Sequence, residues 1–324
     1  MTAVSVSSPS DPLAPAPQTP GAPDGPPPYR VPSRPRKTSV EEQLRKGVGS
    51  ALMVLSACLL VFGLWVTLVS RLHFDRAQHA AYEALRVELA LGTAPNAPTD
   101  PNDSTKLLAL GSPVAVLSIP SIGLRDVVLE GTTGQVLENG PGHLRDTPLP
   151  GQEGTSVIMG RRAAYGGTFS RLGSLNPGAT ITVVTGQAVS SYQVLDLRRA
   201  GDPTPPPLSA RQGRLVLVTA DGAPFTPSGV LYVDADLTTK AQPTPAPVLT
   251  STELPASENA MGTDQGAWLL IVLWGQLLLL ATIALSWLRN EWGRWQTWAI
   301  AIPVLSYITL SLSDQITRLL PNLM

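Results

Sequence analysis

Three uncharged apolar runs limit what this chain can fold into. They cover residues 47–70, 266–288 and 295–313. A helix needs about 20 apolar residues to cross the hydrocarbon core of a bilayer, so each run is predicted to be a transmembrane helix. The first run is longer than the apolar part of a cleaved signal peptide, about 7 to 15 residues, and it follows a long polar segment. It is therefore predicted to be a signal anchor in a multi-pass protein of the cell membrane.

The basic residues beside these runs predict the orientation. Loops rich in Lys and Arg stay in the cytoplasm, so the segment before the first span and the loop 289–294 should both be cytoplasmic. Residues 71–265 should then lie outside the cytoplasm, and so should a short outer tail, 314–324. The residues that decide this are Arg30, Arg34, Arg36, Lys37, Arg45 and Lys46 before the first span, and Arg289 and Arg294 between the other two.

Two segments have the composition of unfolded chain. Residues 1–46 begin with a Pro-rich stretch that contains few bulky apolar side chains, so it cannot bury enough surface to offset the entropy of ordering. They are predicted to be a disordered cytoplasmic tail. Residues 241–265 are rich in Pro, Ser and Thr and are predicted to be a linker to the second span.

The part between the spans has two patterns. Apolar residues recur at helical spacing over residues 72–91, so 71–110 should be a juxtamembrane helix followed by a polar linker. Over residues 111–240 short β-rich segments alternate with Gly and Pro, which is typical of a closed β-barrel or a sandwich. The expected strands lie at 114–119, 127–129, 156–159, 180–184, 192–197, 215–219 and 231–235.

Composition argues against several classes of function. Lys and Arg total 23 and Asp and Glu total 24, so no overall basic field would attract nucleic acid. The single cysteine, Cys58, lies in an apolar run, and the three histidines lack the spacing of a metal site. Phosphate-loop and dinucleotide-binding glycine motifs are absent from the sequence. We therefore predict no cofactor, no metal and no nucleic-acid partner.

Five motifs follow one another in the middle of the chain. Gly140–His143 reads Gly-Pro-Gly-His, Thr147–Gly151 reads Thr-Pro-Leu-Pro-Gly, and Thr155–Arg162 ends in Gly-Arg-Arg. Phe169–Leu175 and Leu215–Thr219 follow, the second of which ends in Thr. In this order the motifs resemble those of the sortase family in a class E-like form, in which the third motif ends in Gly-His-Arg and the fifth in Thr-Cys. Sortases are the transpeptidases that attach proteins to Gram-positive cell walls. The resemblance implies a mostly β fold, a sortase-like eight-stranded β-barrel outside the membrane, joined to three transmembrane helices.

The same resemblance implies that the catalytic positions are degenerate. In the family a histidine acts as acid, a cysteine thiolate attacks the peptide carbonyl, and an arginine stabilises the carbonyl oxygen. The matching positions hold Arg161, Ala220 and Val230. We therefore expect no catalytic residues and no enzyme.

Four residues around these positions are candidates for binding a ligand: Arg161, Thr219, Asp221 and His143. Arg161 could grip a carboxylate as a permanent cation, or it could be an ordinary ion-paired arginine at the rim. Thr219 should point to the strand face opposite Ala220. Asp221 could be a turn residue, and His143 could be a hydrogen-bonded structural residue.

Three functions remain open from the sequence. The first is an inactive sortase-like protein that binds a protein or peptide in the old groove, or acts as a scaffold at the cell envelope. The second is an active transpeptidase that does not use cysteine, and the third is a structural subunit of a membrane assembly. Leu254–Glu258 resembles the Leu-Pro-x-Thr-Gly signal that sortases cut, although an ordinary linker also explains it.

Overall fold

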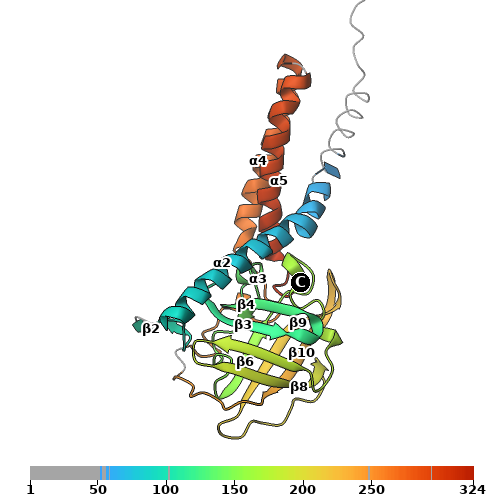
Figure 1. Ribbon diagram of the computed structural model, residues 1–324. Helices are drawn as coiled ribbons and strands as arrows, with labels where there is room; N and C mark the ends of the chain where they lie inside the picture. Colours follow the sequence, from blue (N-terminus) through green and yellow to red (C-terminus); the bar gives the residue numbers. More distant parts are fainter. Residues whose placement is uncertain (1–51, 53–55, 58, 101–102, 247–248, 293) are drawn as a thin grey trace, which may run out of the picture. The chain divides into compact units, whose positions relative to one another are not determined.

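The computed structural model describes residues 52, 56–57, 59–100, 103–246, 249–292 and 294–324 (Figure 1). The predicted tail 1–46 lies outside the described residues, and so do residues 47–51, 53–55 and 58 of the first predicted span, 47–70. From residue 59 onward that span is helical, and Leu59, Leu60 and Leu64 are exposed. That this helix crosses a membrane stays a prediction.

A closed β-barrel forms the globular part, with the strands in the order β10-β8-β7-β3-β4-β5-β6-β9. This confirms the expected eight-stranded barrel. Most neighbours are antiparallel, whereas β4 with β5 and β6 with β9 are parallel. The strands are β3 (Pro113–Ile119), β4 (Leu124–Glu130), β5 (Gly142–His143), β6 (Gly154–Met159), β7 (Thr180–Thr185), β8 (Val189–Arg199), β9 (Gly213–Ala223) and β10 (Thr226–Leu237).

Strand β5 is the one that the apolar pattern did not predict. It has only two residues, so no alternation can be read from it. It follows a short helix, α3 (Gly134–Leu137), and it lies so close to the preceding chain that a Cβ atom at Gly142 would come within 2.1 Å of the carbonyl oxygen of Gly131. The second glycine of the Gly-Pro-Gly-His motif is thus required by close backbone packing.

Strand β9 is buried on both of its faces. Leu215 and Leu217 belong to the main core inside the barrel, whereas Val216, Val218 and Ala220 belong to a second apolar cluster on the other face. Successive side chains of a strand point to opposite faces, so this division follows from the two-residue period. Ala220 therefore lies on the face of β9 that is turned away from the barrel interior.

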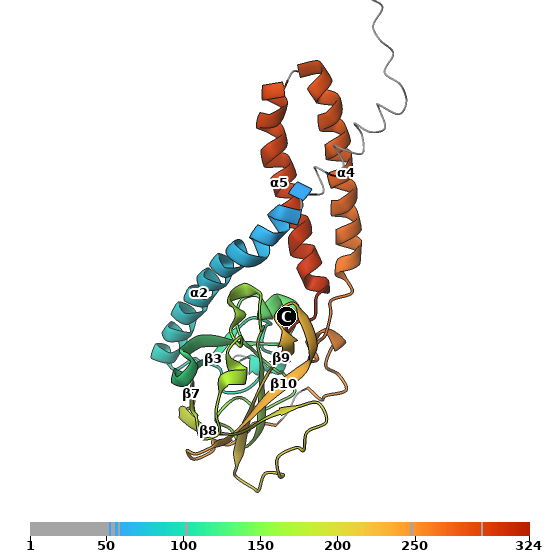
Figure 2. The same ribbon diagram turned by 90° about the vertical axis from the view of Figure 1, so that its right-hand side faces the viewer.

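The predicted juxtamembrane helix is α2 (Ser70–Leu91), which ends at Gly92 in the left-handed conformation. Its apolar face packs against β3 and β4, where Leu85 joins Val116 and Val127 in one cluster. Figure 2 shows α2 passing beside the barrel near β3. The helix thus lies along the barrel. The segment predicted to be a polar linker instead contains a small two-stranded sheet, β1 (Thr99–Asp100) and β2 (Asp103–Leu107).

Helices α4 (Ala267–Trp292) and α5 (Arg294–Leu319) form a hairpin that contains two stretches able to cross a membrane, Ala267–Leu285 and Trp295–Leu319. Apolar side chains such as Leu269, Leu279 and Ile283 are exposed along α4, as expected of a surface that faces lipid. The described residues therefore contain two candidate spans and not the three that were expected.

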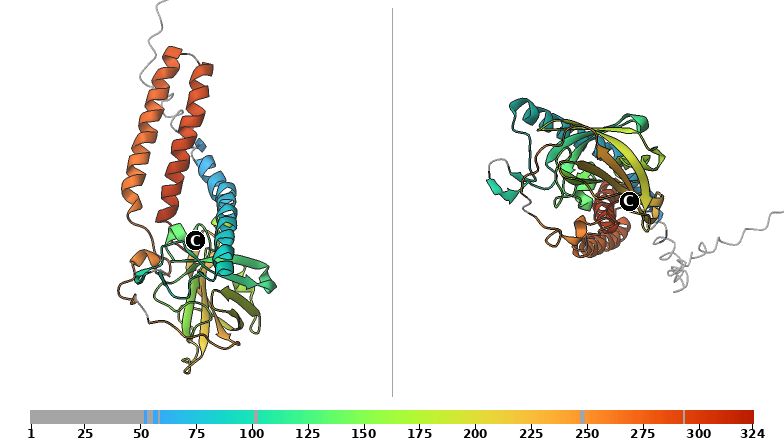
Figure 3. Two further views of the ribbon diagram at one scale, coloured as in Figure 1. Left: turned by 60° about the vertical axis from the view of Figure 1, so that its left-hand side comes forward. Right: turned by 90° about the horizontal axis from the view of Figure 1, so that it is seen from below.

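The hairpin differs from the prediction at its two ends. The expected loop 289–294 is helical except at residue 293, which lies outside the described residues, because the helical hydrogen bonds continue past the apolar run. Helix α5 also continues past residue 313, where Asp314 and Arg318 pair one turn apart with a distance of 3.1 Å. The predicted outer tail 314–324 is thus partly helix. The C-terminus lies against the barrel (Figure 3).

Candidate functional site

Arg161 follows directly after β6 and is fully enclosed, with 1% of its surface exposed. Its guanidinium donates hydrogen bonds to the carbonyl oxygen of Gly134 at 2.9 Å and to a carboxylate oxygen of Glu138 at 3.4 Å. It also lies over the ring of Tyr165, 4.9 Å from the ring centre. The expectation of a rim arginine is therefore wrong, because α3 and the chain after it cover the end of β6.

Glu138 supplies the negative charge of this cluster. Burial raises the pKa of its carboxyl group to about 7, although the nearby charge of Arg161 acts in the opposite direction. A buried carboxylate beside a buried guanidinium is usually held by several hydrogen bonds, because two unpaired charges would be costly in this environment. Glu138 can hold a proton or a negative charge beside Arg161, but neither side chain is a nucleophile toward a peptide.

The other two matched positions, Ala220 and Val230, lie directly opposite one another on β9 and β10. Ala220 is buried, and Val230 packs against the same apolar cluster. Thr219, as predicted from the strand period, has its hydroxyl on the other side, where it donates to the carbonyl oxygen of Gly160 at 2.9 Å. That hydroxyl is completely buried and is already used in a structural hydrogen bond.

The last residues of the chain cover Ala220. Leu323 is fully buried and belongs to the cluster that contains Ala220, Val218 and Met159. Its carbonyl oxygen accepts a hydrogen bond of 2.9 Å from the backbone N–H of Arg162. The face of β9 on which the nucleophile would lie is thus occupied by the protein's own chain.

Sequence reasoning missed these residues, because 314–324 was predicted to be a short outer tail. One feature of the sequence indicates that this segment packs against the protein. Leu320 and Pro321 repeat the first two residues of the Leu-Pro-x-Thr-Gly signal, and two apolar residues, Leu323 and Met324, follow shortly after them. Such residues at the end of a tail would be exposed to water unless they packed against something.

His143 does not belong to the apolar cluster that contains Ala220. It is fully buried, and its Nδ1 is 2.9 Å from Glu130 while its Nε2 is 3.0 Å from the carbonyl oxygen of Pro148. Burial lowers the pKa of His143, but the charge and hydrogen bond of Glu130 and the Pro148 carbonyl outweigh it, so the pKa is raised overall. Both ring nitrogens face acceptors, which suits a protonated ring that braces the loop after β5.

Asp221 lies next to Ala220 but faces a different group of residues. Its carboxylate accepts a hydrogen bond of 2.7 Å from Arg199 of β8, and this bond is the main reason why its pKa is lowered. Arg162 is nearer the cluster and donates to the carbonyl oxygen of Ala220 at 3.1 Å. The structure thus brings Ala220 and Val230 together in one apolar cluster, whereas Arg161, His143 and Asp221 form hydrogen bonds with residues outside it.

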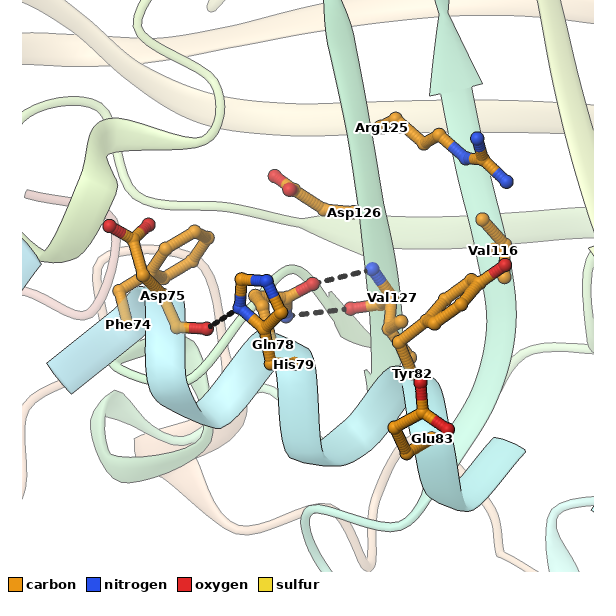
Figure 4. A pocket seen from close by; sticks show the side chains of 10 residues that line it. All are labelled: Phe74, Asp75, Gln78, His79, Tyr82, Glu83, Val116, Arg125, Asp126 and Val127. Atoms are coloured by element: carbon orange, nitrogen blue, oxygen red, sulfur yellow. Dashed lines mark hydrogen bonds between the residues drawn. The ribbon is translucent and has the colours of Figure 1, made fainter. Parts of the chain in front are cut away.

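A pocket of about 480 Å³ lies elsewhere, between α2 and the strands β3 and β4 (Figure 4). Gln78 crosses its floor, accepts from the backbone N–H of Val127 at 2.6 Å and donates to the carbonyl oxygen of the same residue at 3.1 Å. Burial raises the pKa of Asp126 to about 6, with a smaller contribution from Asp75. The lining residues are Phe74, Asp75, Gln78, His79, Tyr82, Glu83, Val116, Arg125, Asp126 and Val127.

Comparison with known proteins agrees with the barrel. A sequence model of the sortase domain matches residues 117–237. Sortase D of Bacillus subtilis is 26% identical over 118 residues, which are 36% of this chain and 58% of that protein. The chain thus spans about 58% of the length of this curated relative.

Solved sortase structures are similar as well. A Sortase D5 transpeptidase of Clostridium perfringens matches with a TM-score of 0.40 and 21% identity, over 51% of this chain and 99% of that one. A mutant of sortase E from Streptomyces avermitilis matches with a TM-score of 0.35 and 29% identity, over 47% of this chain and all of that one. The sequence match and the eight-stranded barrel lead to one conclusion: residues 117–237 form a domain of the sortase family.

Proposed function

We propose that the protein is a catalytically inactive, membrane-anchored sortase-like protein whose barrel is an extracytoplasmic binding or scaffold module at the cell envelope. The observation that carries the proposal is the composition of the site. Arg161, Ala220 and Val230 stand at the positions that the family resemblance assigns to the acid, the nucleophile and the oxyanion group. A methyl group at residue 220 cannot form the thiolate that attacks a peptide carbonyl.

A hydroxyl nucleophile is a poor substitute in this site. Thr219 is the nearest candidate, and its hydroxyl is buried and donates to Gly160. A hydroxyl also needs a neighbouring base, and His143 is engaged by Glu130 and Pro148. These contacts support the inactive protein over the transpeptidase that does not use cysteine.

The structural-subunit alternative is favoured by one observation. The face over Ala220 is filled by Leu323, so the site offers little room while the end of the chain stays in place. A barrel that serves only as a spacer would be free to fill its old groove in this way. A ligand can therefore bind over Ala220 only if Leu323 and its neighbours move out of the apolar cluster.

The experiment that tests the proposal is an activity assay on the purified full-length protein in detergent. Peptides that carry a Leu-Pro-x-Thr-Gly signal are incubated with the protein, with and without an amine acceptor, over a series of pH values. The expected result is neither cleavage nor an acyl intermediate. Turnover that is abolished by Thr219→Val in a protein that still folds would replace the proposal with the hydroxyl enzyme.

Restoring the thiol is the matched control. Catalytic groups that act as a unit are strongly non-additive, so Ala220→Cys alone should give little activity. The new thiol would lack a histidine, because Arg161 occupies that position. Substantial cleavage by Ala220→Cys would show that the remaining site is more complete than we propose.

A further inference from the structure

The end of the chain is bound in the manner of a peptide ligand. Leu323 is enclosed by apolar residues from three elements: Leu137 of α3, Met159 of β6, and Val216, Val218 and Ala220 of β9. This cluster is separate from the main core inside the barrel. It therefore forms a pocket for one aliphatic side chain on the outer face of β9.

The backbone of the bound segment is also recognised. The Asn322 N–H donates to the carbonyl oxygen of Gly262 at 2.9 Å, and the Leu323 carbonyl accepts from the Arg162 N–H at 2.9 Å. The carbonyl oxygen of Met324 accepts a longer bond of 3.4 Å from the guanidinium of Arg161. Three successive residues are thus held by main-chain contacts, as in peptide recognition along a strand end.

Asn322 adds specificity for its own side chain. Its amide donates to the carbonyl oxygens of Thr132 at 2.8 Å and Asn259 at 3.0 Å, and it has a weaker contact of 3.4 Å with Ser257. The residue is completely buried, so a side chain without this amide would remove the Asn322 donor from the Thr132 carbonyl, whereas the Asn259 carbonyl would still accept from the Gly262 N–H at 2.8 Å. The site therefore distinguishes an Asn-Leu pair from most other dipeptides.

Helix α5 controls where this segment lies. Near the end of the helix, the Thr317 hydroxyl is 3.1 Å from the hydroxyl of Tyr165, and the Arg318 carbonyl accepts from the Asp264 N–H at 3.2 Å. Only Leu320 and Pro321 separate the helix from the bound Asn322. A shift of α5 along its axis would therefore pull Leu323 out of its pocket.

We propose that residues 321–324 are an intramolecular peptide ligand that closes this pocket, and that a peptide with an Asn-Leu pair can bind there only when the end of α5 releases the pocket. This deepens the proposed function by naming the occupant and the ligand class. It does not depend on the absence of catalysis, since occupancy and turnover are measured separately. Tethering raises the effective concentration of the bound segment to about the millimolar range, so a free peptide competes poorly with it.

Thiol labelling of the full-length protein in detergent tests this proposal. In a Cys58→Ser background, Ala220→Cys places a single thiol under Leu323, and Ser228→Cys places one at an exposed position of β10 as the control. When Leu323 is unchanged, the thiol at 220 should react at least about tenfold more slowly than the thiol at 228, since burial of a leucine side chain favours the closed state by this factor or more.

Leu323→Asp should remove the protection of the thiol at 220 and leave the labelling of the thiol at 228 unchanged. Leu323→Ala and Asn322→Ala are milder variants that should give intermediate rates, and the melting temperature shows that each variant is folded. A synthetic peptide with the sequence of residues 317–324 should restore protection in the Leu323→Asp protein. The same peptide should have little effect on the protein that keeps Leu323.

Three results would overturn the proposal. The first is equal labelling of the thiols at 220 and 228 in the protein that keeps Leu323, which would mean that the segment does not cover Ala220. The second is continued protection in the folded Leu323→Asp protein, which would mean that Leu323 is not what protects the thiol. The third is a failure of the peptide to protect the Leu323→Asp protein, which would mean that the pocket does not bind this sequence.

Discussion

The backbone N–H of Arg162 donates a hydrogen bond to the carbonyl oxygen of Leu323, with 2.9 Å between the two atoms. Arg162 matches the arginine of the Gly-His-Arg ending that this strand resembles, in which Arg161 stands at the histidine position, and Leu323 is near the end of the given sequence. Through this bond and the burial of Leu323, the apolar cluster that contains Ala220 includes a segment that lies far from Ala220 in the sequence.

Arg161→Ala should destabilise the protein strongly. A rim ion pair would be worth about 0 to 1 kcal/mol, but removal of one partner from a buried pair typically costs about 3 to 5 kcal/mol, because the other charge is left without compensation. Thermal unfolding of the purified protein measures the change. Arg171→Ala, which removes an exposed arginine, is the control and should leave the melting temperature nearly unchanged. Equal melting temperatures for the two variants would contradict the buried ion pair.

A second change should partly rescue the related variant Arg161→Met, which also removes the buried positive charge. Replacing Glu138 as well, in Arg161→Met with Glu138→Leu, removes both charges and fills the space with apolar atoms. The double variant should therefore be more stable than the sum of the single effects, by at least about 0.5 kcal/mol in a double-mutant cycle. Additive effects would indicate that the two side chains, 3.4 Å apart, do not stabilise one another.

His143 should make stability fall at alkaline pH. Its pKa is raised in the folded protein, so the folded state holds this proton more tightly than the unfolded chain does. The stabilisation is fully present below the unfolded pKa of about 6.5 and is lost as the pH rises through the higher folded pKa. Glu130→Gln should reduce this dependence, as measured by the melting temperature between about pH 6 and 9. His79→Gln changes an exposed ring and should leave the pH profile as it is.

Asp126→Asn should stabilise the protein at neutral pH. Burial raises the pKa of Asp126 to about 6, so the folded protein loses stability as the pH rises from about 3.8 through that value. The cost at neutral pH amounts to at most about 3 kcal/mol, and a neutral amide avoids it. The melting temperature of the variant should exceed that of the parent at pH 7 but should match it below about pH 4. A lower melting temperature at neutral pH would show that the carboxylate is needed in the pocket.

The predicted orientation can be tested on intact cells from which the wall has been removed. Basic residues before the first span and around the junction of α4 and α5 predict that those segments are cytoplasmic, so added protease should remove the barrel and spare the tail 1–46. Antibodies against the two parts read the result. Loss of the tail together with a protected barrel would reverse the orientation and remove the envelope role.

The sequence by itself determined the barrel, helix α2 and the apolar hairpin. Each depends on a local pattern: alternation along strands such as 215–219, helical spacing over 72–91, and uncharged runs of membrane length at 266–288 and 295–313. The sequence also shows that Cys58 is the only cysteine in the chain and lies in an apolar run, which is the basis for predicting that the barrel has no cysteine nucleophile. Patterns of this kind involve residues close together in the chain, so one sequence is enough to recognise them.

Only the tertiary structure decided what happens at the site. The burial of Arg161 depends on Glu138 and on Met324, and the pocket over Ala220 is completed by Leu323. These residues come from segments far apart in the sequence, and none of them belongs to a periodic pattern that would predict the contact. Residues 314–324 are predicted from the sequence to be a short outer tail, but in the structure Leu323 and Met324 are buried against the barrel. The apolar surface that they contact exists only once the barrel has folded.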